Sequence, residues 1–336
     1  MNKFLTLALT TTALSAGAVQ AADLTKVTFG TNWVAQAEHG GYYQSVVDGT
    51  YAECGLDVTI LPGGPQVSND ALLVAGRIDF YMGGTLGAFD AVAEGIPMVL
   101  VAASFQKDPQ VLMTHPGAIS SFEELAGLDK LIIGDGGFVT YFKVFEKEVG
   151  LEASKRVPYT FNPAPFIADP KSAQQGYITS EPYAIEKEAG WAPDIWLLGD
   201  QGYAPYATTI VTMQKTIDDS PDVVKCFVEG SNKGWANFLY GDNAEAVALI
   251  QEHNPDMSDD KIAFSIETMK KYGIVDSGDT ESLGIGAMTD ERMESFFNAM
   301  VEVGVVDADV DYKAAYTLEF TNDGLSLPIK EKLMTE

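Results

Sequence analysis

Short apolar runs, bounded by glycine and proline, alternate with segments of helical periodicity along the first third of this sequence. The runs have the length and composition of strands, and the segments between them repeat apolar residues at intervals of three and four positions. Strands are predicted at 27–33, 56–60, 78–82, 98–103 and 111–114, and helices at 41–53, 67–75 and 86–94. This alternation favours an α/β lobe with a mainly parallel sheet, which the last of these strands would leave.

A second unit of the same kind follows, and the chain then returns to the first. Within the second unit, strands are predicted at 131–134, 157–161, 176–179 and 195–198, and helices at 121–125, 139–149 and 183–188. The strand 209–213 is expected to rejoin the first lobe, and later helices are predicted at 222–240, 244–253, 259–271 and 290–301. An interrupted lobe is joined to its neighbour by two crossings, expected near 114–117 and 203–208, and loops that face such a cleft bind ligands.

The N-terminus has the pattern of a secretory signal peptide. Lys3 precedes an apolar run of small residues that ends in Val19-Gln20-Ala21, a small-x-Ala cleavage pattern. The run is too short and too rich in Thr and Ser for a spanning helix. We therefore expect residues 1–21 to be removed and the mature protein to be periplasmic. The remaining chain is expected to form lobe 1 from 22–114 and 207–336, and lobe 2 from 115–206.

Charge and composition exclude several partners. The 48 acidic residues exceed the 21 basic residues, and the formal net charge of -27 disfavours both nucleic acid and anionic membrane surfaces. The three histidines lie far apart and show no metal-ligand spacing, so no metal or cofactor is expected. Cys54 and Cys226 either form one disulfide in an oxidising compartment or are two separate small buried residues, and their distance in the sequence favours the second interpretation.

Several short motifs follow one another in a characteristic order. They are Thr31-Asn32-Trp33, His39-Gly40-Gly41-Tyr42-Tyr43, Ala75-Gly76-Arg77-Ile78-Asp79-Phe80 and Glu181-Pro182-Tyr183. Together they resemble the thiamine-pyrimidine-synthase-like group of ABC-importer solute-binding proteins, to which nitrate, taurine and alkanesulfonate binders are related. The resemblance covers residues 27–214. Each motif is weak by itself, and the specificity lies in the ordered set.

The resemblance implies a type II periplasmic-binding-protein fold, in which two α/β lobes joined by two crossings enclose a cleft, with helices at the C-terminus. It also implies a monomer that passes a small molecule to the permease and ATPase subunits of an ABC importer. The related synthase is an enzyme that needs a lysine for pyridoxal phosphate. This sequence has no lysine between Lys26 and Lys107, where the synthase carries it, so no Schiff base can form there and no enzymatic activity is expected.

Candidate ligand contacts in the first lobe follow the ends of predicted strands or open a helix. An indole there can stack on a flat heterocycle, an amide or imidazole can exchange hydrogen bonds, and a glycine before a hydroxyl permits close approach. Only one of the adjacent Tyr42 and Tyr43 can face the cleft. Each candidate also has a structural interpretation as core, turn or helix start. The candidates are Asn32, Trp33, His39, Tyr42, Gly84 and Thr85.

In the second lobe, Glu181 is the leading candidate, because a carboxylate just past a strand accepts N–H groups and repels anions. In the family that the sequence resembles, the matching acid binds the exocyclic amine of a pyrimidine. The glycine-rich segment 136–140 is expected to turn its backbone N–H groups toward the cleft, with aromatic rings beside it. The remaining candidates are Gly137, Phe138, Thr140, Tyr141 and, at the second crossing, Tyr206.

The candidate loops contain no Arg or Lys, which a sulfonate or nitrate site needs. A small N-heterocycle related to a thiamine pyrimidine precursor therefore fits best, and contacts with both lobes are expected to favour a closed form. Three alternatives stay open. They are a taurine, alkanesulfonate or nitrate binder, a quaternary-amine binder whose cation is held by aromatic rings and Glu181, and a synthase-like enzyme.

Overall fold

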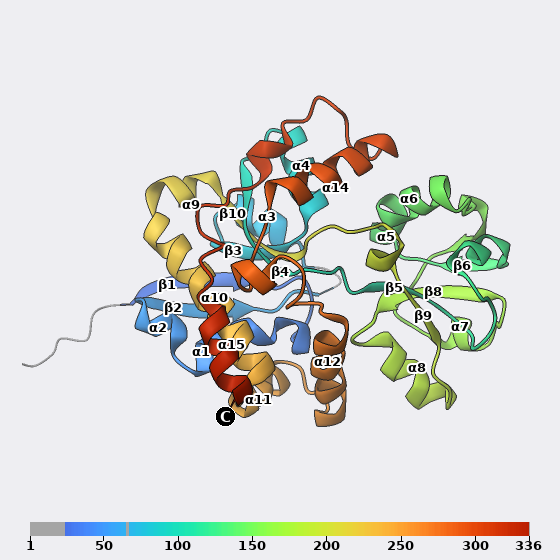
Figure 1. Ribbon diagram of the computed structural model, residues 1–336, viewed down its shortest axis with the longest axis horizontal. Coiled ribbons are helices and arrows are strands. Elements are labelled where there is room, and N and C mark those ends of the chain that lie inside the picture. Colours follow the sequence, from blue (N-terminus) through green and yellow to red (C-terminus); the bar gives the residue numbers. More distant parts are fainter. Residues whose placement is uncertain (1–23, 65–66, 336) are drawn as a thin grey trace, which may run out of the picture.

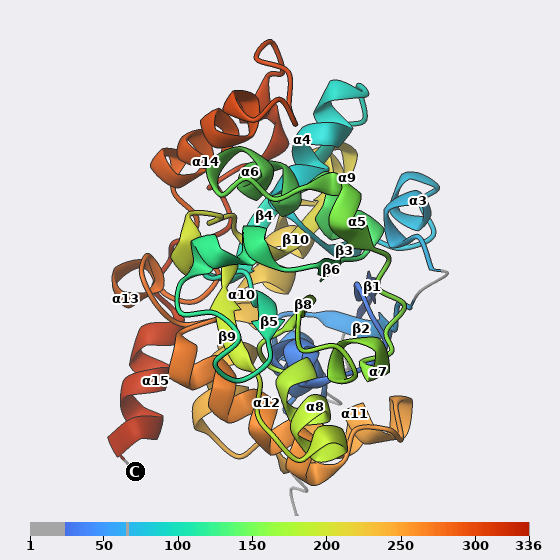
Figure 2. The ribbon, with the colours of Figure 1, turned by 90° about the vertical axis from the view of Figure 1, so that its right-hand side faces the viewer.

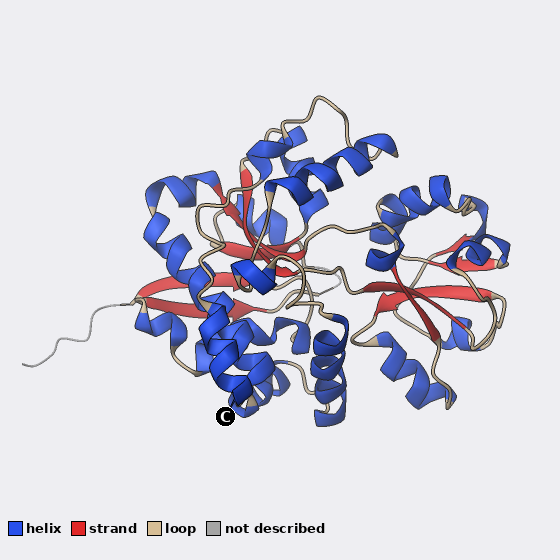
Figure 3. Cartoon of the chain, viewed as in Figure 1, coloured by secondary structure: helices blue, strands red, loops and turns tan. Residues whose placement is uncertain are grey.

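The computed structural model describes residues 24–64 and 67–335, which form two lobes side by side (Figure 1). The predicted signal peptide, residues 1–21, lies outside this part of the chain. Each lobe contains a five-stranded sheet flanked by helices, as Figure 3 shows. The α/β class and the two-lobed architecture predicted from the sequence are confirmed.

The first lobe is built on a sheet with the strand order β2-β1-β3-β10-β4. β1 (Thr25–Gly30) pairs in parallel with β2 (Leu56–Leu61) and β3 (Phe80–Gly83), whereas β10 (Ala207–Met213) runs antiparallel between β3 and β4 (Met98–Phe105). All eight residues of β4 are buried, as its continuous apolar run predicts. The return of the chain to the first sheet is therefore confirmed.

Helices from both ends of the described chain surround this sheet. The 3₁₀ helix η1 (Ala37–His39) precedes α1, and α10 packs closely on α1 because Gly41 and Gly234 carry no side chain at the contact. A Cβ on Gly41 would lie 2.2 Å from the Trp235 ring. The helices are α1 (Gly40–Val47), α2 (Thr50–Glu53), α3 (Asn69–Val74), α4 (Thr85–Ala93), α9 (Gln214–Asp219), α10 (Pro221–Tyr240), α11 (Ala244–His253), α12 (Asp259–Tyr272), α13 (Thr280–Leu283), α14 (Asp290–Glu302) and α15 (Ser326–Thr335).

The second lobe, which faces the viewer in Figure 2, has the strand order β7-β6-β8-β5-β9. β6 (Lys130–Ile132) pairs in parallel with β7 (Arg156–Val157) and β8 (Ser172–Tyr177), and β5 (Gln110–Thr114) runs antiparallel between β8 and β9 (Asp194–Leu197). Its helices are η2 (Phe122–Gly127), α5 (Asp135–Val139), α6 (Tyr141–Glu148), η3 (Ala153–Lys155), α7 (Ala164–Ile167), α8 (Glu181–Ala189) and η4 (Leu198–Gln201).

One predicted strand lies in the other lobe. The sequence suggests 111–114 as the last strand of the first lobe, but β5 is hydrogen-bonded to β8 and β9 inside the second sheet. The first crossing therefore runs through 106–109 and not 114–117, while the second, 198–206, overlaps the predicted 203–208. An apolar run does not reveal which sheet it joins, because its partners come from distant segments.

Local backbone geometry divides two predicted helices. The segment 41–53 separates into α1 and α2 at Gly49, whose φ of 78° is easily adopted by glycine. The segment 139–149 is helical as α6 only from Tyr141, because Thr140, with φ -115° and ψ -103°, separates it from α5. The predicted helix 121–125 is the 3₁₀ helix η2, and Ser121 provides no side-chain cap for it.

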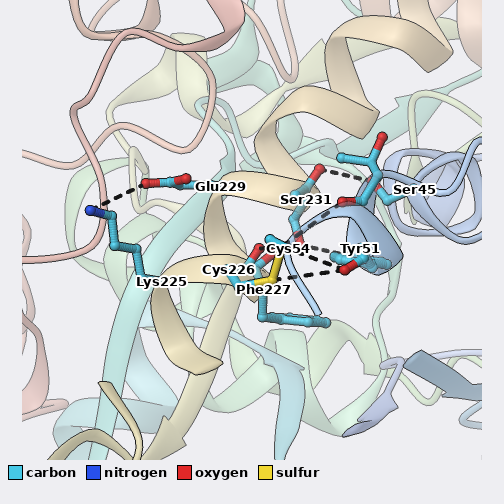
Figure 4. The surroundings of a disulfide bond; sticks show 10 residues. Ser45, Tyr51, Cys54, Lys225, Cys226, Phe227, Glu229 and Ser231 are labelled. Carbon is cyan, nitrogen blue, oxygen red and sulfur yellow. Dashed lines mark hydrogen bonds and ion pairs between the residues drawn. A yellow bond between two sulfur atoms is a disulfide. The ribbon is translucent and has the colours of Figure 1, made fainter. Parts of the chain in front are cut away.

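Cys54 and Cys226 form a disulfide, with their Cα atoms 5.8 Å apart (Figure 4). The interpretation as two separate small residues is therefore wrong, because the packing of α10 brings together positions 172 residues apart. The bond joins the end of α2 to α10. Beside it, Tyr51 stacks on Phe227 with ring centroids 5.3 Å apart, and its hydroxyl hydrogen-bonds the Ser231 hydroxyl at 2.8 Å. The disulfide and the contacts of Tyr51 thus anchor α10 to α2 in the first lobe.

We expect the double substitution Cys54→Ala and Cys226→Ala to lower the free energy of unfolding by about 2–5 kcal/mol, because the bond closes a long loop in the unfolded chain. Urea titration followed by circular dichroism measures the change. A titration of reduced wild-type protein separates the lost bond from the altered side chains. Equal unfolding midpoints for oxidised and reduced protein would contradict the prediction.

Candidate functional site

Two adjoining cavities lie in a cleft between the lobes. The aromatic chamber has a volume of about 290 Å³ and the wide chamber about 580 Å³. Both are lined by residues of the first lobe, just past β1, and by residues of the second lobe, on β8 and just past β7. The wall that the two chambers share consists of Asn32, Tyr159, Phe161, Gln175 and Tyr177. A ligand at this wall would contact both lobes.

Rings from both lobes line the aromatic chamber. Trp33 of the first lobe is partly buried, and its ring centroid lies 5.0 Å from that of Phe161 in the second lobe. The Tyr159 ring lies 5.2 Å from the same phenyl ring. Phe161 is 59% exposed and has a φ of 60°, in the left-handed region that residues other than glycine rarely occupy. These flat apolar faces are suited to stacking on a planar ligand.

Glu181 supplies the charge of the aromatic chamber. Its Oε2 accepts hydrogen bonds from the Tyr177 backbone N–H and the Ser180 hydroxyl, both at 2.8 Å, and its Oε1 accepts one from the Tyr159 hydroxyl at 3.4 Å. Glu181 is also the first residue of α8, where the helix dipole favours a negative charge. The carboxylate is therefore held in place before any ligand arrives, ready to accept an N–H group.

His39 lies behind the chamber wall and does not line it. Its side chain is fully buried, and Nε2 is 3.0 Å from Oδ1 of Asn32. Burial lowers the pKa of His39 to about 3, so the ring is neutral at pH 7 and carries one proton. That proton is on Nε2, which faces an acceptor, while Nδ1 is buried without a partner among the described residues. The predicted ligand contact at His39 is corrected to a residue that positions Asn32.

Glu38, the neighbour of His39, connects the lobes. Its Oε1 accepts a hydrogen bond from the Thr179 hydroxyl of the second lobe, and the Ser265 hydroxyl of α12 donates to the Thr179 carbonyl oxygen at 2.8 Å. Burial raises the pKa of Glu38 to about 7, partly offset by the bond from Thr179. The buried carboxyl group of Glu38 thus contacts the second lobe at Thr179, two residues before Glu181.

The wide chamber is polar, and its internal hydrogen bonds hold the second crossing. The Thr85 hydroxyl donates to the Tyr206 carbonyl oxygen at 2.8 Å, and the Tyr206 hydroxyl donates to Asp279. Asp108 also lines this chamber, and burial raises the pKa of its carboxyl group. Among the described residues that line either chamber there is no Lys or Arg. Lys261 lines a third cavity, which shares Trp33, Tyr159 and Glu181 with the aromatic chamber.

Most of the predicted contacts do lie at the cleft. Asn32, Trp33 and Glu181 line the aromatic chamber, and Asn32 also reaches the wide chamber. Five further predicted residues line the wide chamber. They are Gly84, Thr85, Gly137, Thr140 and Tyr206. The structure thus brings together residues that are far apart in the sequence.

Three further predicted contacts, besides His39, lie elsewhere. Tyr42 is fully buried in the core of the first lobe, where its hydroxyl hydrogen-bonds the Ser104 hydroxyl at 2.6 Å. Phe138 packs under the Arg156 guanidinium, 4.7 Å from the ring centroid, and Tyr141 is fully buried in the second lobe. An aromatic residue on a helix has the same sequence signature whether it faces a core or a cleft.

The predicted nest of free N–H groups at 136–140 is closed in part, because two of these groups bond within the protein. The segment belongs largely to α5, in which the Phe138 N–H donates to the Gly134 carbonyl at 3.0 Å and the Thr140 N–H donates to the Gly137 carbonyl at 3.4 Å. A Cβ on Gly137 would come within 2.6 Å of the Tyr141 ring. Two adjacent glycines favour a loop, but packing in the lobe overrides this weak local preference.

Much of the second-lobe wall consists of residues that were not among the predicted contacts. Alternate residues of a strand share a face, so Gln175 and Tyr177 point the same way from β8. This signal is weak in the sequence, because the predicted strand began only at Gly176. Tyr159 and Phe161 fall in the predicted strand 157–161, but the chain leaves the sheet after Val157. The missed lining residues of the aromatic chamber are Gln36, Tyr159, Phe161, Gln175, Gly176, Tyr177 and Ser180.

Residues 24–64 and 67–335 contain neither a metal-binding cluster nor a membrane-spanning helix. No group of three or more His, Cys, Asp or Glu side chains there is arranged to hold a metal ion. In the same part of the chain, no helix is long and apolar enough to cross a membrane.

We expect His39→Gln to keep a donor toward Asn32 while removing a titration. The pKa of His39 is about 3 in the folded protein and 6.5 in the unfolded chain. Between these two values only the unfolded state takes up a proton at His39, so the wild-type protein loses stability as the pH is lowered from 6.5 toward 3. The variant should lose this dependence, up to about 1.4 kcal/mol per pH unit. Urea unfolding above and below pH 6.5 measures the difference in the free energy of unfolding between the two proteins. Glu38 contributes with the opposite sign in both proteins, so its contribution cancels in this difference. A difference that is constant with pH would refute the prediction.

Comparisons with known proteins connect this cleft to a family. A family model described as NMT1/THI5 like matches residues 36–246. No curated protein matches the sequence. The zinc-bound ligand-binding component of an ABC-type import system from Staphylococcus aureus is 14% identical, with a TM-score of 0.60 over 88% of this chain and 97% of its own. The aliphatic sulphonate-binding protein SsuA from Escherichia coli is 15% identical, with a TM-score of 0.60 over 86% of this chain and 91% of its own.

The fold is also found in an enzyme. The desulfurization enzyme DSZB is 12% identical, with a TM-score of 0.54 over 90% of this chain and 99% of its own. At these identities the solved structures establish the fold alone, and that fold is the periplasmic-binding-protein fold predicted from the sequence. The family model covers more than half of the residues, and the chain therefore belongs to the NMT1/THI5-like family.

Proposed function

We propose that this protein is the periplasmic solute-binding component of an ABC importer, and that it captures a small amine-bearing N-heterocycle, similar to a thiamine pyrimidine precursor. The observation that carries the proposal is a fixed carboxylate, Glu181, among aromatic rings in a cleft between two lobes. The family match and the import-system component from Staphylococcus aureus support the transport role. The partners are then a permease and an ATPase, and the binding protein acts as a monomer.

The chamber chemistry suits a flat ring with an N–H group. Trp33 and Phe161 lie on different lobes, so a ring in contact with both would hold the lobes together. Aromatic pairs contribute about 0.5–1.5 kcal/mol beyond their buried area. Glu181 accepts the amine of such a ring through a charge-assisted hydrogen bond. Because these contacts come from both lobes, the ligand binds the closed form more tightly and shifts the population toward it.

The two crossings supply a hinge for this closure. Arg292 of α14 donates hydrogen bonds to the Gln106 carbonyl oxygen of the first crossing and, at 3.1 Å, to the Pro205 carbonyl oxygen of the second. Its guanidinium also lies 4.1 Å from the centroid of the Tyr206 ring. One side chain thus anchors both connecting segments to the first lobe. Rotation about 106–109 and 198–206 can then move the second lobe as a unit.

The alternatives are supported less well. A sulfonate or nitrate would face Glu181 and Asp108 with no cationic side chain among the described lining residues. A synthase-like enzyme would need an amine for pyridoxal phosphate, and the same lining residues include no lysine. A quaternary amine is the second candidate, because aromatic rings around a carboxylate also hold cations.

A thermal-shift screen tests the ligand class. We expect amine-bearing N-heterocycles to raise the melting temperature of the mature protein, since a ligand at 100 times its dissociation constant adds about 2.7 kcal/mol. Glu181→Gln keeps an oxygen for Tyr177 and Ser180 but loses the charge, and should weaken binding about tenfold to hundredfold. Taurine, an alkanesulfonate, nitrate and tetramethylammonium belong in the same screen.

The matched control is Glu186→Gln, which makes the same charge change at an exposed position of the same helix. This variant should bind as the wild type does. Stabilisation by tetramethylammonium alone would favour the quaternary-amine candidate. Stabilisation only by sulfonates or nitrate would overturn the proposed ligand class.

A further inference from the structure

Resting on the proposed function, we propose that the ligand presents hydrogen-bond acceptors, ring nitrogens or carbonyl oxygens, to two side-chain NH2 groups, those of Asn32 in the first lobe and Gln175 in the second. Together with the N–H group that faces Glu181, this describes an amidine-like or lactam-like edge, in which an acceptor lies beside an N–H donor. Both amides belong to the wall that the two chambers share.

The orientation of Gln175 follows from its oxygen. Oε1 accepts a hydrogen bond from the Gly134 backbone N–H at 2.6 Å and another from the Tyr141 hydroxyl at 3.2 Å. A carbonyl oxygen has two lone pairs, so this atom is fully used. The NH2 group makes no hydrogen bond to any residue in the described chain. Because Gln175 lines both chambers, its two N–H groups are the part left for a ligand.

Asn32 is oriented in the same way from the opposite lobe. Its Oδ1 faces Nε2 of the buried His39 at 3.0 Å, and the neutral imidazole donates the one proton it carries. The amide oxygen therefore points to the protein, and the NH2 group is left for the cleft. The buried His39 and Tyr141, both predicted as ligand contacts, instead fix the direction of the two amides that line the site.

These fixed groups define which hydrogen-bond donors and acceptors a ligand needs. The amides donate and cannot rotate without losing internal hydrogen bonds, and Glu181 accepts. An aminopyrimidine or an aminopyrimidinone satisfies both demands with ring nitrogens or a carbonyl next to an amine. Aniline, which has the amine and the ring but no ring acceptor, leaves the two amides unpaired. A site built with such groups discriminates strongly against analogues that lack the partner atom.

The test exchanges donors for acceptors without disturbing the wall. Gln175→Glu keeps an oxygen for Gly134 and Tyr141, and Asn32→Asp keeps one for His39, but each turns the cleft-facing NH2 into a carboxylate oxygen. We expect the melting temperature without ligand to stay near that of the wild type. Titration calorimetry with 4-aminopyrimidine and cytosine should show a loss of affinity of about tenfold to hundredfold in each variant. Aniline should bind wild-type protein at least tenfold more weakly than 4-aminopyrimidine.

A charge control is available in the same chamber. Gln36→Glu adds the same charge to an amide that lines the aromatic chamber, and this side chain has no hydrogen bond within the described part of the molecule to fix its direction. It should weaken binding less than Gln175→Glu does. Equal losses in these two variants would show a general charge effect and overturn the inference.

Failure of this inference is distinct from failure of the proposed function. If Glu181→Gln weakens 4-aminopyrimidine binding while Gln175→Glu and Asn32→Asp do not, or if aniline binds as well, the acceptor edge is wrong and the amine site stands. If neither 4-aminopyrimidine nor cytosine binds at millimolar concentration, both proposals about the ligand are overturned.

Discussion

The antiparallel insertion of β10 between β3 and β4 is the constraint on which the rest of the molecule depends. The chain leaves the first sheet after β4, builds the second lobe and must come back to occupy that place in the ladder. Two connecting segments therefore run between the lobes, and Arg292 binds a carbonyl oxygen of each. In the proposed function, these two segments are the hinge about which the cleft opens and closes. Chamber residues from β1, β7 and β8 meet because the crossings place these strand ends opposite one another.

A further contact between the lobes lies next to the aromatic chamber. Thr179 donates to the buried Glu38 through its hydroxyl and accepts from Ser265 through its backbone, so the turn that leads into α8 is held from the first lobe on both sides. Glu181 begins that helix two residues later. Glu181 and Lys261 also act on the ionisation of Glu38, in opposite directions. Because burial raises the pKa of Glu38 to about 7, the charge at this contact changes near neutral pH.

The sequence predicts elements better than it predicts partners. Alternating strands and helices, the returning strand 209–213 and Glu181 past the end of β8 all follow from local patterns, because periodicity and turn residues are local properties. The lobe to which β5 belongs, the disulfide between Cys54 and Cys226, and the burial of Tyr42 depend on segments far apart in the chain. Gln175 could not be singled out for the same reason, since its role is set by Gly134 and Tyr141, which fix the direction of its amide.

A shared fold does not decide what this cleft binds. The sulphonate-binding protein from Escherichia coli has the same architecture at 15% identity, yet ligand choice depends on the side chains at the loop ends. Here those ends carry a carboxylate held by three hydrogen bonds and two amides whose oxygens are already used. The carboxylate repels an anion, whereas the two amides donate hydrogen bonds and ask for an acceptor, and each unpaired buried polar group costs about 1–3 kcal/mol. In the proposed function, the hydrogen bonds that stabilise the wall of the free protein are therefore the same bonds that restrict its ligand.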